Sequence, residues 1–263
     1  SSKGLFLRFF KRLSEMSAST KILPKSVAID WGNTRLKAGV FADTQLVHKE
    51  TNLTPRQLGE WVKEQAPHHL IVSSVQEDAA PWMDAMTVPG KKIYLTNRLD
   101  LPITLDYETP HTLGVDRIAA ACGAIQIFPG THCLVIDAGT CITYDWIDDT
   151  HCVRGGAIAP GAAMRFQAMH TFTARLPLVE MTNQVALTGK STITSMQSGV
   201  INGMLAEIQG IIDRYLTLYP HLKVVLCGGD AQLFENQLKP PIFAAPDLVL
   251  TGLNRILTHH VGL

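Results

Sequence analysis

Val27–Phe41 reads VAIDWGNTRLKAGVF, and the same pattern returns at Leu134–Ile147 as LVIDAGTCITYDWI. Each copy is an apolar run that ends in an aspartate, followed by a glycine-containing break with a threonine and by a second run in which apolar and polar residues alternate. This pattern predicts a strand, a turn and a second strand, with the aspartate at the mouth of the turn. Two copies indicate two related half-domains whose turns face each other across a cleft.

Both turns have the chemistry of a phosphate site. Each contains one aspartate, one glycine and one threonine: Asp30, Gly32 and Thr34 in the first, Asp137, Gly139 and Thr140 in the second. The glycines let the backbone approach a ligand closely, and turn amides and threonine hydroxyls can donate to phosphate oxygens. A bare carboxylate would repel phosphate, so the arrangement requires a cation between them. A single copy could equally be an ordinary hairpin, but the repetition favours the binding site.

A third segment, Tyr107–Ala124, reads YETPHTLGVDRIAAACGA. Gly114 marks the end of a loop, and the small residues after Arg117 predict a helix that packs closely on its neighbours. Asp116 and Arg117 therefore lie near a helix N-terminus. From these residues alone, Asp116 could cap the helix with Arg117 in solvent, or it could act in catalysis.

Together, these segments resemble the three motifs of the type III pantothenate kinases, a family of the actin, sugar kinase and Hsp70 ATPase superfamily. The matching residues are Asp30-Trp31-Gly32-Asn33-Thr34 with Lys37, Gly114-Val115-Asp116-Arg117, and Asp137-Ala138-Gly139-Thr140. The likeness extends from about Val27 to the C-terminus. It implies an α/β fold with two actin-like ATPase (ribonuclease H-like) half-domains, at residues 26–130 and 131–263, around a nucleotide cleft. Residues 1–25 would be an extension, flexible or extraneous to the working chain.

The resemblance also implies a reaction. The family phosphorylates pantothenate with ATP to give 4'-phosphopantothenate, the first step of coenzyme A biosynthesis, with the aspartate of the GxDR motif, here Asp116, as general base. The implied nucleotide contacts, for ATP as its magnesium complex, are Asp30, Gly32, Asn33, Thr34, Lys37, Gly139 and Thr140. The implied substrate contacts are Tyr107, Gly114, Val115, Asp116, Arg117 and Thr192. Asp137 would bind a monovalent cation, potassium or ammonium. Arg117 is a plausible partner for the pantothenate carboxylate.

Periodicity and glycine spacing predict further elements. Gly155–Gly161 reads GGAIAPG and is expected to form a loop that leads into a helix at Ala162–Arg175. This run also resembles a glycine-rich segment of the family, and the resemblance implies that it shapes the cleft and the subunit contact. A long amphipathic helix is expected at Ser195–Tyr219, where three glycines suggest close packing against another element. We expect Asp145 to serve strand and turn chemistry, and Asp247–Leu257 to form a short strand and a helix.

Composition narrows the class of protein. The formal net charge is zero, which disfavours a protein that binds nucleic acid through its phosphates. The five cysteines show neither a CxxC pair nor zinc-ligand spacing, so we expect free thiols in a reducing cytoplasm. Leu5–Met16 predicts an amphipathic helix, which is too short and too charged to span a membrane. We expect no nucleic acid or membrane partner, and the family resemblance implies that the assembly is a homodimer.

Two other functions remain open at this point. Some members of the family were described as accessory factors for transcription, so the fold could bind nucleotide without turning over pantothenate. A kinase of the same fold acting on another small alcohol is a third possibility. Trp31 also departs from the family pattern, because a smaller residue usually stands there in the first phosphate turn.

Overall fold

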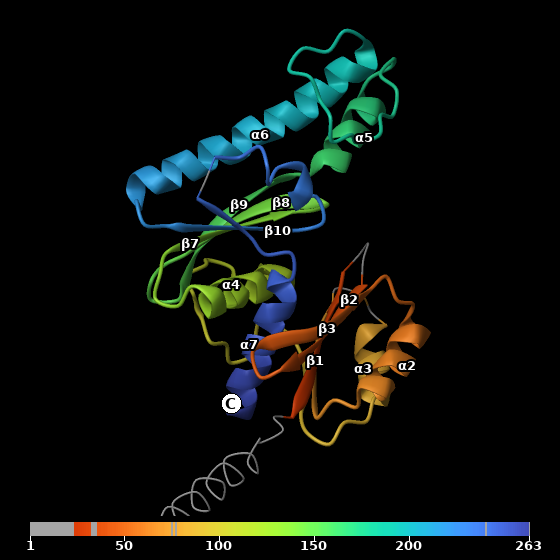
Figure 1. Cartoon of the computed structure of the whole chain (residues 1–263), viewed down its shortest axis with the longest axis vertical. Coiled ribbons are helices and arrows are strands. Elements are labelled where there is room, and N and C mark those ends of the chain that lie inside the picture. Colours follow the sequence, from red (N-terminus) through yellow and green to blue (C-terminus); the bar gives the residue numbers. More distant parts are fainter. Residues whose placement is uncertain (1–23, 33–35, 75, 77, 240, 263) are drawn as a thin grey trace, which may run out of the picture.

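The computed structural model describes residues 24–32, 36–74, 76, 78–239 and 241–262. Within them, two mixed β-sheets lie on either side of a pair of helices (Figure 1). The expected helix at Leu5–Met16 and the first phosphate-turn residues Asn33 and Thr34 lie outside the described residues. No described helix is long and apolar enough to cross a membrane.

The first sheet, sheet A, is built from five strands in the order β3-β2-β1-β4-β5. The strands are β1 (Lys25–Trp31), β2 (Leu36–Ala42), β3 (Gln45–Thr51), β4 (His69–Ser74) and β5 (Lys92–Tyr94). β1, β2 and β3 form an antiparallel meander, and β4 and β5 continue the sheet in parallel on the other side of β1. Helices α2 (Pro55–Gln65) and α3 (Ala79–Ala85) cover one face, where they bury Val27 and Ile29.

The second sheet, sheet B, repeats this connectivity. Its strands are β6 (Thr104–Leu105), β7 (Cys133–Ala138), β8 (Cys141–Ile147), β9 (Cys152–Pro160), β10 (Lys223–Cys227) and β11 (Ile242–Ala244). The order β9-β8-β7-β10-β11 matches β3-β2-β1-β4-β5, with the same antiparallel and parallel pairs, and β6 is added beside β9. Helices α5 (Ala162–Phe172) and α6 (Thr192–Leu218) cover its outer face. The repeated sequence pattern is therefore a repeated sheet.

The inner faces of both sheets pack on α4 (Val115–Ile127) and α7 (Leu248–Val261). Alternation along the strands explains this: Ala28 of β1 and Val135 of β7 turn inward, while their neighbours turn outward. The two helices cross at glycines. A Cβ added to Gly252 would lie 1.7 Å from the Ala119 carbonyl oxygen, and one added to Gly123 would lie 2.3 Å from that of Leu248. The C-terminal helix is thus fixed between the two sheets.

The glycine-rich run at residues 155–161 is not the expected loop. It lies mostly within β9, whose register against β8 shifts between Trp146 and Ile147. Gly155 has φ +115°, and a Cβ added to Gly156 would lie 1.9 Å from the Tyr144 carbonyl oxygen. These glycines therefore serve an irregular strand. The helix that follows ends at Phe172 instead of Arg175.

Two other expectations were wrong. The glycines of α6, at positions 199, 203 and 210, do not pack against another part of the described chain, because added Cβ atoms there would meet nothing within 4 Å. The last strand, β11, precedes Asp247, and Leu248–Val261 is entirely helix. By contrast, the helix α2 at Pro55–Gln65 begins with a capping box at Thr54, a signal that the local sequence contains. The free thiols are confirmed: all five cysteines are unpaired, and all but Cys141 are buried.

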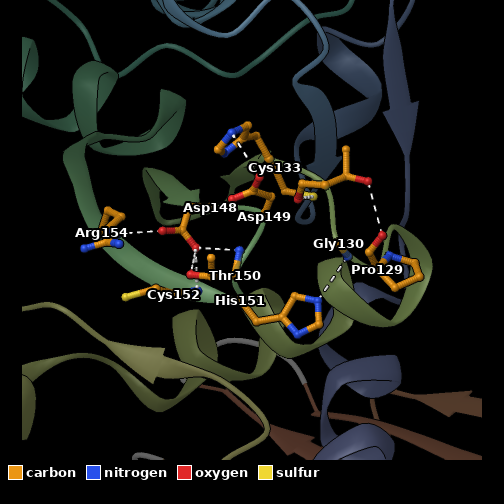
Figure 2. A network of polar contacts seen from close by, with 11 residues as sticks. Pro129, Gly130, Cys133, Asp148, Asp149, Thr150, His151, Cys152 and Arg154 are labelled. Atoms are coloured by element: carbon orange, nitrogen blue, oxygen red, sulfur yellow. Dashed lines mark hydrogen bonds and ion pairs between the residues drawn. The ribbon is translucent and has the colours of Figure 1, made fainter.

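The turn between β8 and β9 is held by one carboxylate (Figure 2). Asp148 accepts hydrogen bonds from the backbone N–H groups of Thr150 and Cys152, both at 2.9 Å, and from Arg154 Nε at 2.7 Å. These donors stabilise the charged form and keep the pKa of Asp148 well below its usual range, although burial opposes them. Arg154 Nη1 also donates to Asp106 Oδ2 at 2.9 Å. The network thus anchors the segment that leads to Tyr107.

Candidate active site

Four charged side chains from the predicted motifs come together between the sheets. Asp30 stands near the end of β1, Asp137 near the end of β7 and Asp116 in the first turn of α4, while Lys37 is the antiparallel neighbour of Asp30 on β2. Asp116 and Lys37 each interact electrostatically with both strand-end aspartates. Side chains from three motifs that are far apart in the sequence therefore lie close enough to interact electrostatically.

The surroundings of the two strand-end carboxylates, Asp30 and Asp137, disfavour their ionised form. Burial raises the pKa of Asp30 to about 7, against the opposing effect of Lys37, and the carboxylates of Asp116 and Asp137 add to the rise. Burial raises the pKa of Asp137 to about 6, and Asp116 adds to this as well. Desolvation and like charge both disfavour the ionised form. A cation bound here would favour the ionised carboxylates. The residues therefore fit a site that binds a cation together with an anionic ligand.

The chemistry of the donors suits magnesium carried by a nucleotide. Among the described residues, no group of three or more His, Cys, Asp or Glu side chains could hold a metal ion by itself. Magnesium is usually bound through one or two carboxylates, with the phosphates of a substrate and waters completing the shell. Asp30, with Asp137 beside it, would supply that kind of incomplete protein contribution.

Asp116 is exposed at the start of α4. Gly114 is the N-cap, so Asp116 is not the capping residue; its Oδ1 accepts from the Arg117 N–H at 2.9 Å. A Cβ added to Gly114 would lie 2.5 Å from this same oxygen. The glycine of the GVDR sequence therefore leaves space for the aspartate carboxylate. An exposed carboxylate at a helix N-terminus can accept a proton from a ligand placed against it.

Arg117 does not point to solvent. Its Nε donates to Asp145 Oδ1 at 3.0 Å and to Oδ2 at 3.1 Å, and Nη2 also donates to Oδ1. The Arg117 and Asp145 side chains are only 9% and 2% exposed. Arg117 Cζ lies 5.9 Å from the centre of the Tyr107 ring. Asp145 lies in a strand as expected, but its carboxylate pairs with an arginine of α4, which we did not predict. The available signal was a charged residue in the middle of a strand between Tyr144 and Trp146.

The second phosphate turn is supported by residues from two later segments. The Gly161 N–H donates to the Thr140 carbonyl at 3.1 Å, and an added Cβ there would lie 2.1 Å from the Gly139 carbonyl oxygen. Gly228, with φ +98°, packs in the same way, and its Cβ would lie 2.4 Å from Asp137 Oδ1. Close backbone approach thus shapes the walls of this turn from both sides.

Thr192 is not brought to this site within one chain. It is the first residue of α6, which lies on the outer face of sheet B, whereas α4 lies on the inner face (Figure 1). Tyr107, Gly114, Val115 and Arg117 do lie together at the start of α4 or in contact with it.

The amino-acid sequence is similar to that of a known protein family. The profile of the family described as type III pantothenate kinase matches residues 26–214. The type III pantothenate kinase of Cytophaga hutchinsonii is 43% identical over 236 residues, which cover 90% of this chain and 100% of that protein. The chain belongs to the type III pantothenate kinase family.

Solved structures agree on the fold of this type III pantothenate kinase family member. A conserved putative Baf family transcriptional activator from Campylobacter jejuni is 24% identical, with a TM-score of 0.59, over 90% of this chain and 100% of that chain. A putative 2-dehydro-3-deoxygalactonokinase from Sinorhizobium meliloti is 15% identical, with a TM-score of 0.56, over the same shares. At these identities the likeness concerns the fold, and the expected actin-like, sugar kinase type of α/β fold is confirmed.

Proposed function

We propose that Asp116 is the general base with which this chain carries out the reaction of its family, the ATP-dependent phosphorylation of pantothenate in coenzyme A biosynthesis. The observation that carries this proposal is the meeting of Asp116 with Asp30, Asp137 and Lys37. In this arrangement, Asp116 accepts the proton of the substrate hydroxyl while the hydroxyl oxygen attacks the γ-phosphorus of ATP. The bond between this phosphorus and the β–γ bridging oxygen breaks, and ADP leaves. Lys37, and the cations held by Asp30 and Asp137, would offset the negative charge of the phosphates.

The nucleotide is proposed to lie between the two strand-end turns. Asp30 would hold the magnesium ion of Mg-ATP, and Asp137 the monovalent cation, potassium or ammonium. A bound metal ion supplies charge stabilisation for the transferred phosphoryl group. Lys37 adds a fixed positive charge on the side of β2, and the backbone of Gly32, Gly139 and Thr140 offers donors to phosphate oxygens. Asn33 and Thr34 complete the proposed nucleotide contacts. The raised pKa values of Asp30 and Asp137 support a site that needs cations to stay ionised.

The substrate is proposed to lie against the start of α4. Tyr107, Gly114, Val115 and Arg117 would surround pantothenate, and Gly114 keeps space beside the Asp116 carboxylate for its hydroxyl. The N-terminus of α4 favours anionic groups nearby, since its first N–H groups carry partial positive charge.

The assembly is proposed to be a homodimer. Large apolar side chains gather around α5, the segment after it and the start of α6, and these are Ile158, Met164, Phe172, Leu178, Met181, Leu187 and Ile193. We call this set the α5–α6 apolar patch. We take these exposed apolar side chains as the interaction site, because large exposed apolar patches mark such sites. Thr192 is next to Ile193 of this patch. In the proposed dimer, it would reach the substrate of the partner subunit through the subunit contact.

A coupled ADP-release assay with pantothenate and ATP, run in potassium and in sodium, tests these roles. Asp116→Asn keeps the shape of the side chain but removes the base, so we expect turnover to fall by about a hundredfold or more with the thermal unfolding temperature unchanged. Wild-type activity in folded Asp116→Asn would contradict the role of the base. A folded wild-type protein that binds ATP without turning over pantothenate would point instead to a nucleotide-binding accessory factor or another alcohol substrate.

A further inference from the structure

We propose that Asp145 is a positioning residue, which holds Arg117 and through it sets the place of the Asp116 carboxylate. The inference rests on the proposed role of Asp116 and deepens it, because it assigns the orientation of the base to a second carboxylate on a different element.

Asp145 lies inside sheet B. Its backbone lies in the middle of β8, opposite Val135 of β7 on one side and Gly156 of β9 on the other. Gly156 also leaves space for the carboxylate, since an added Cβ would lie 3.0 Å from Asp145 Oδ1. An anchor that is paired on both sides moves little, so whatever Asp145 holds is fixed relative to the second phosphate turn.

Arg117 connects this anchor to the base with two different groups. Its guanidinium is held by both oxygens of Asp145, at 3.0 and 3.1 Å from Nε, in a nearly dry contact. Its backbone N–H donates to Asp116 Oδ1 at 2.9 Å. A planar fork on a carboxylate fixes orientation as well as distance. The first turn of α4, and the carboxylate of Asp116 with it, is therefore oriented by the sheet.

The same geometry limits what Arg117 can offer to an anionic substrate. Asp145 already takes Nε and Nη2 of the guanidinium. A substrate carboxylate that displaced Asp145 would leave a buried charge without its partner, which is strongly unfavourable. Positioning is thus the role that the buried pair itself supports, and any contact with substrate must use the remaining face of the guanidinium.

Steady-state kinetics with pantothenate and ATP separate positioning from binding. In Asp145→Asn we expect kcat to fall roughly ten- to a hundredfold, because a displaced base is misaligned with the substrate hydroxyl, while both KM values change less than about threefold. Arg117→Lys should lose kcat by a similar factor, since an ammonium cannot reproduce the fork. The double variant should be no slower than the slower single variant, because both changes break the same link.

A matched control is available on the other face of the same strand. Glu207 accepts from Arg165 Nη2 at 2.7 Å and from the hydroxyl of Tyr144, the neighbour of Asp145, at 2.9 Å. Glu207→Gln therefore weakens a comparable ion pair next to β8 without touching α4, and kcat should stay within about twofold of the wild type. If Asp145→Asn does not fold, Asp145→Glu decides, since it keeps the charge and shifts the guanidinium; it too should lose kcat.

Three outcomes would overturn the inference. These are a folded Asp145→Asn or Asp145→Glu protein with wild-type kcat, a rise in the KM for pantothenate at unchanged kcat, and an equal loss of kcat in Glu207→Gln. The second would make the pair a substrate contact, and the third a general support of the fold. Failure of the proposed function looks different, because the wild-type protein would then show no pantothenate-dependent turnover in the same assay.

Discussion

Asp30 and Asp137 are destabilising residues in the free protein. An ordinary aspartate has a pKa of about 3.9 in an unfolded chain. In the fold, burial raises the pKa of Asp30 to about 7 and that of Asp137 to about 6. The folded protein therefore keeps protons that the unfolded chain has already released. Stability then falls as pH rises from the unfolded pKa towards the folded values, and the loss is complete above them. This is the opposite of the behaviour of an ion-paired aspartate.

The resulting prediction concerns the free energy of unfolding in buffer without metal or nucleotide. Between about pH 5 and pH 8 the wild-type protein should lose stability, and Asp30→Asn should lose less over the same range because the neutral amide has no proton to release. Thermal or urea unfolding at three pH values measures both slopes. Equal slopes in the two proteins would contradict the burial of an ionisable Asp30.

At the scale of elements, the contact between α4 and α7 depends on two glycines. A methyl group at position 252 would lie 1.7 Å from the Ala119 carbonyl oxygen, so Gly252→Ala must push the helices apart. Overpacking of this kind costs about 1–3 kcal/mol of stability. Because α4 carries Asp116, we expect kcat to fall as well. Urea unfolding and the ADP-release assay measure the two effects.

Gly210→Ala in α6 is the matched control for this prediction. It is also a helical glycine, but an added Cβ meets nothing within 4 Å. Alanine favours a helix by about 1 kcal/mol over glycine, so this variant should be as stable as the wild type or more stable, with unchanged kcat. A loss of stability of the same size in both variants would show that the helix contact is not the cause.

The same elements show what the sequence can and cannot predict. The strand–turn–strand copies and α2 follow from local periodicity and capping, which a short segment contains in full. The glycine-rich run of β9 was wrongly predicted to be a loop. Glycine is needed there because the Tyr144 carbonyl of the neighbouring strand leaves no space for a side chain. The ion pair of Asp145 was missed for a similar reason, since its partner Arg117 comes from a helix that precedes β8 in the sequence. A residue whose function depends on a distant partner carries little local signal.

At the scale of the whole molecule, the duplicated sheets explain where the chemistry occurs. β1 and β7 occupy the same place in each sheet, so their terminal aspartates come from equivalent positions in two related units. The α4 and α7 helices fill the space between these units, and the first turn of α4 places Asp116 between them. The pairing of Ser26 Oγ with Asn254 Oδ1, at 2.6 Å, ties the last helix back to the first strand. Both termini of the described chain therefore contribute to the arrangement.

The α5–α6 apolar patch carries the last prediction, which concerns the assembly. Phe172 is 85% and Leu187 83% exposed in one chain, and burying such a side chain stabilises an interface by about 1.5–3 kcal/mol. The wild-type protein should therefore have twice the mass of one chain in light scattering, and a double variant with Phe172→Glu and Leu187→Glu should have the mass of one chain. Val47→Glu is the control, because Val47 is 49% exposed on β3 of the other sheet and should leave the dimer intact. A wild-type monomer, or a double variant that remains dimeric, would contradict an interface at this patch.

If the dimer also brings Thr192 to substrate, the monomeric variant should have a higher KM for pantothenate than the control, while its affinity for ATP should stay within about twofold.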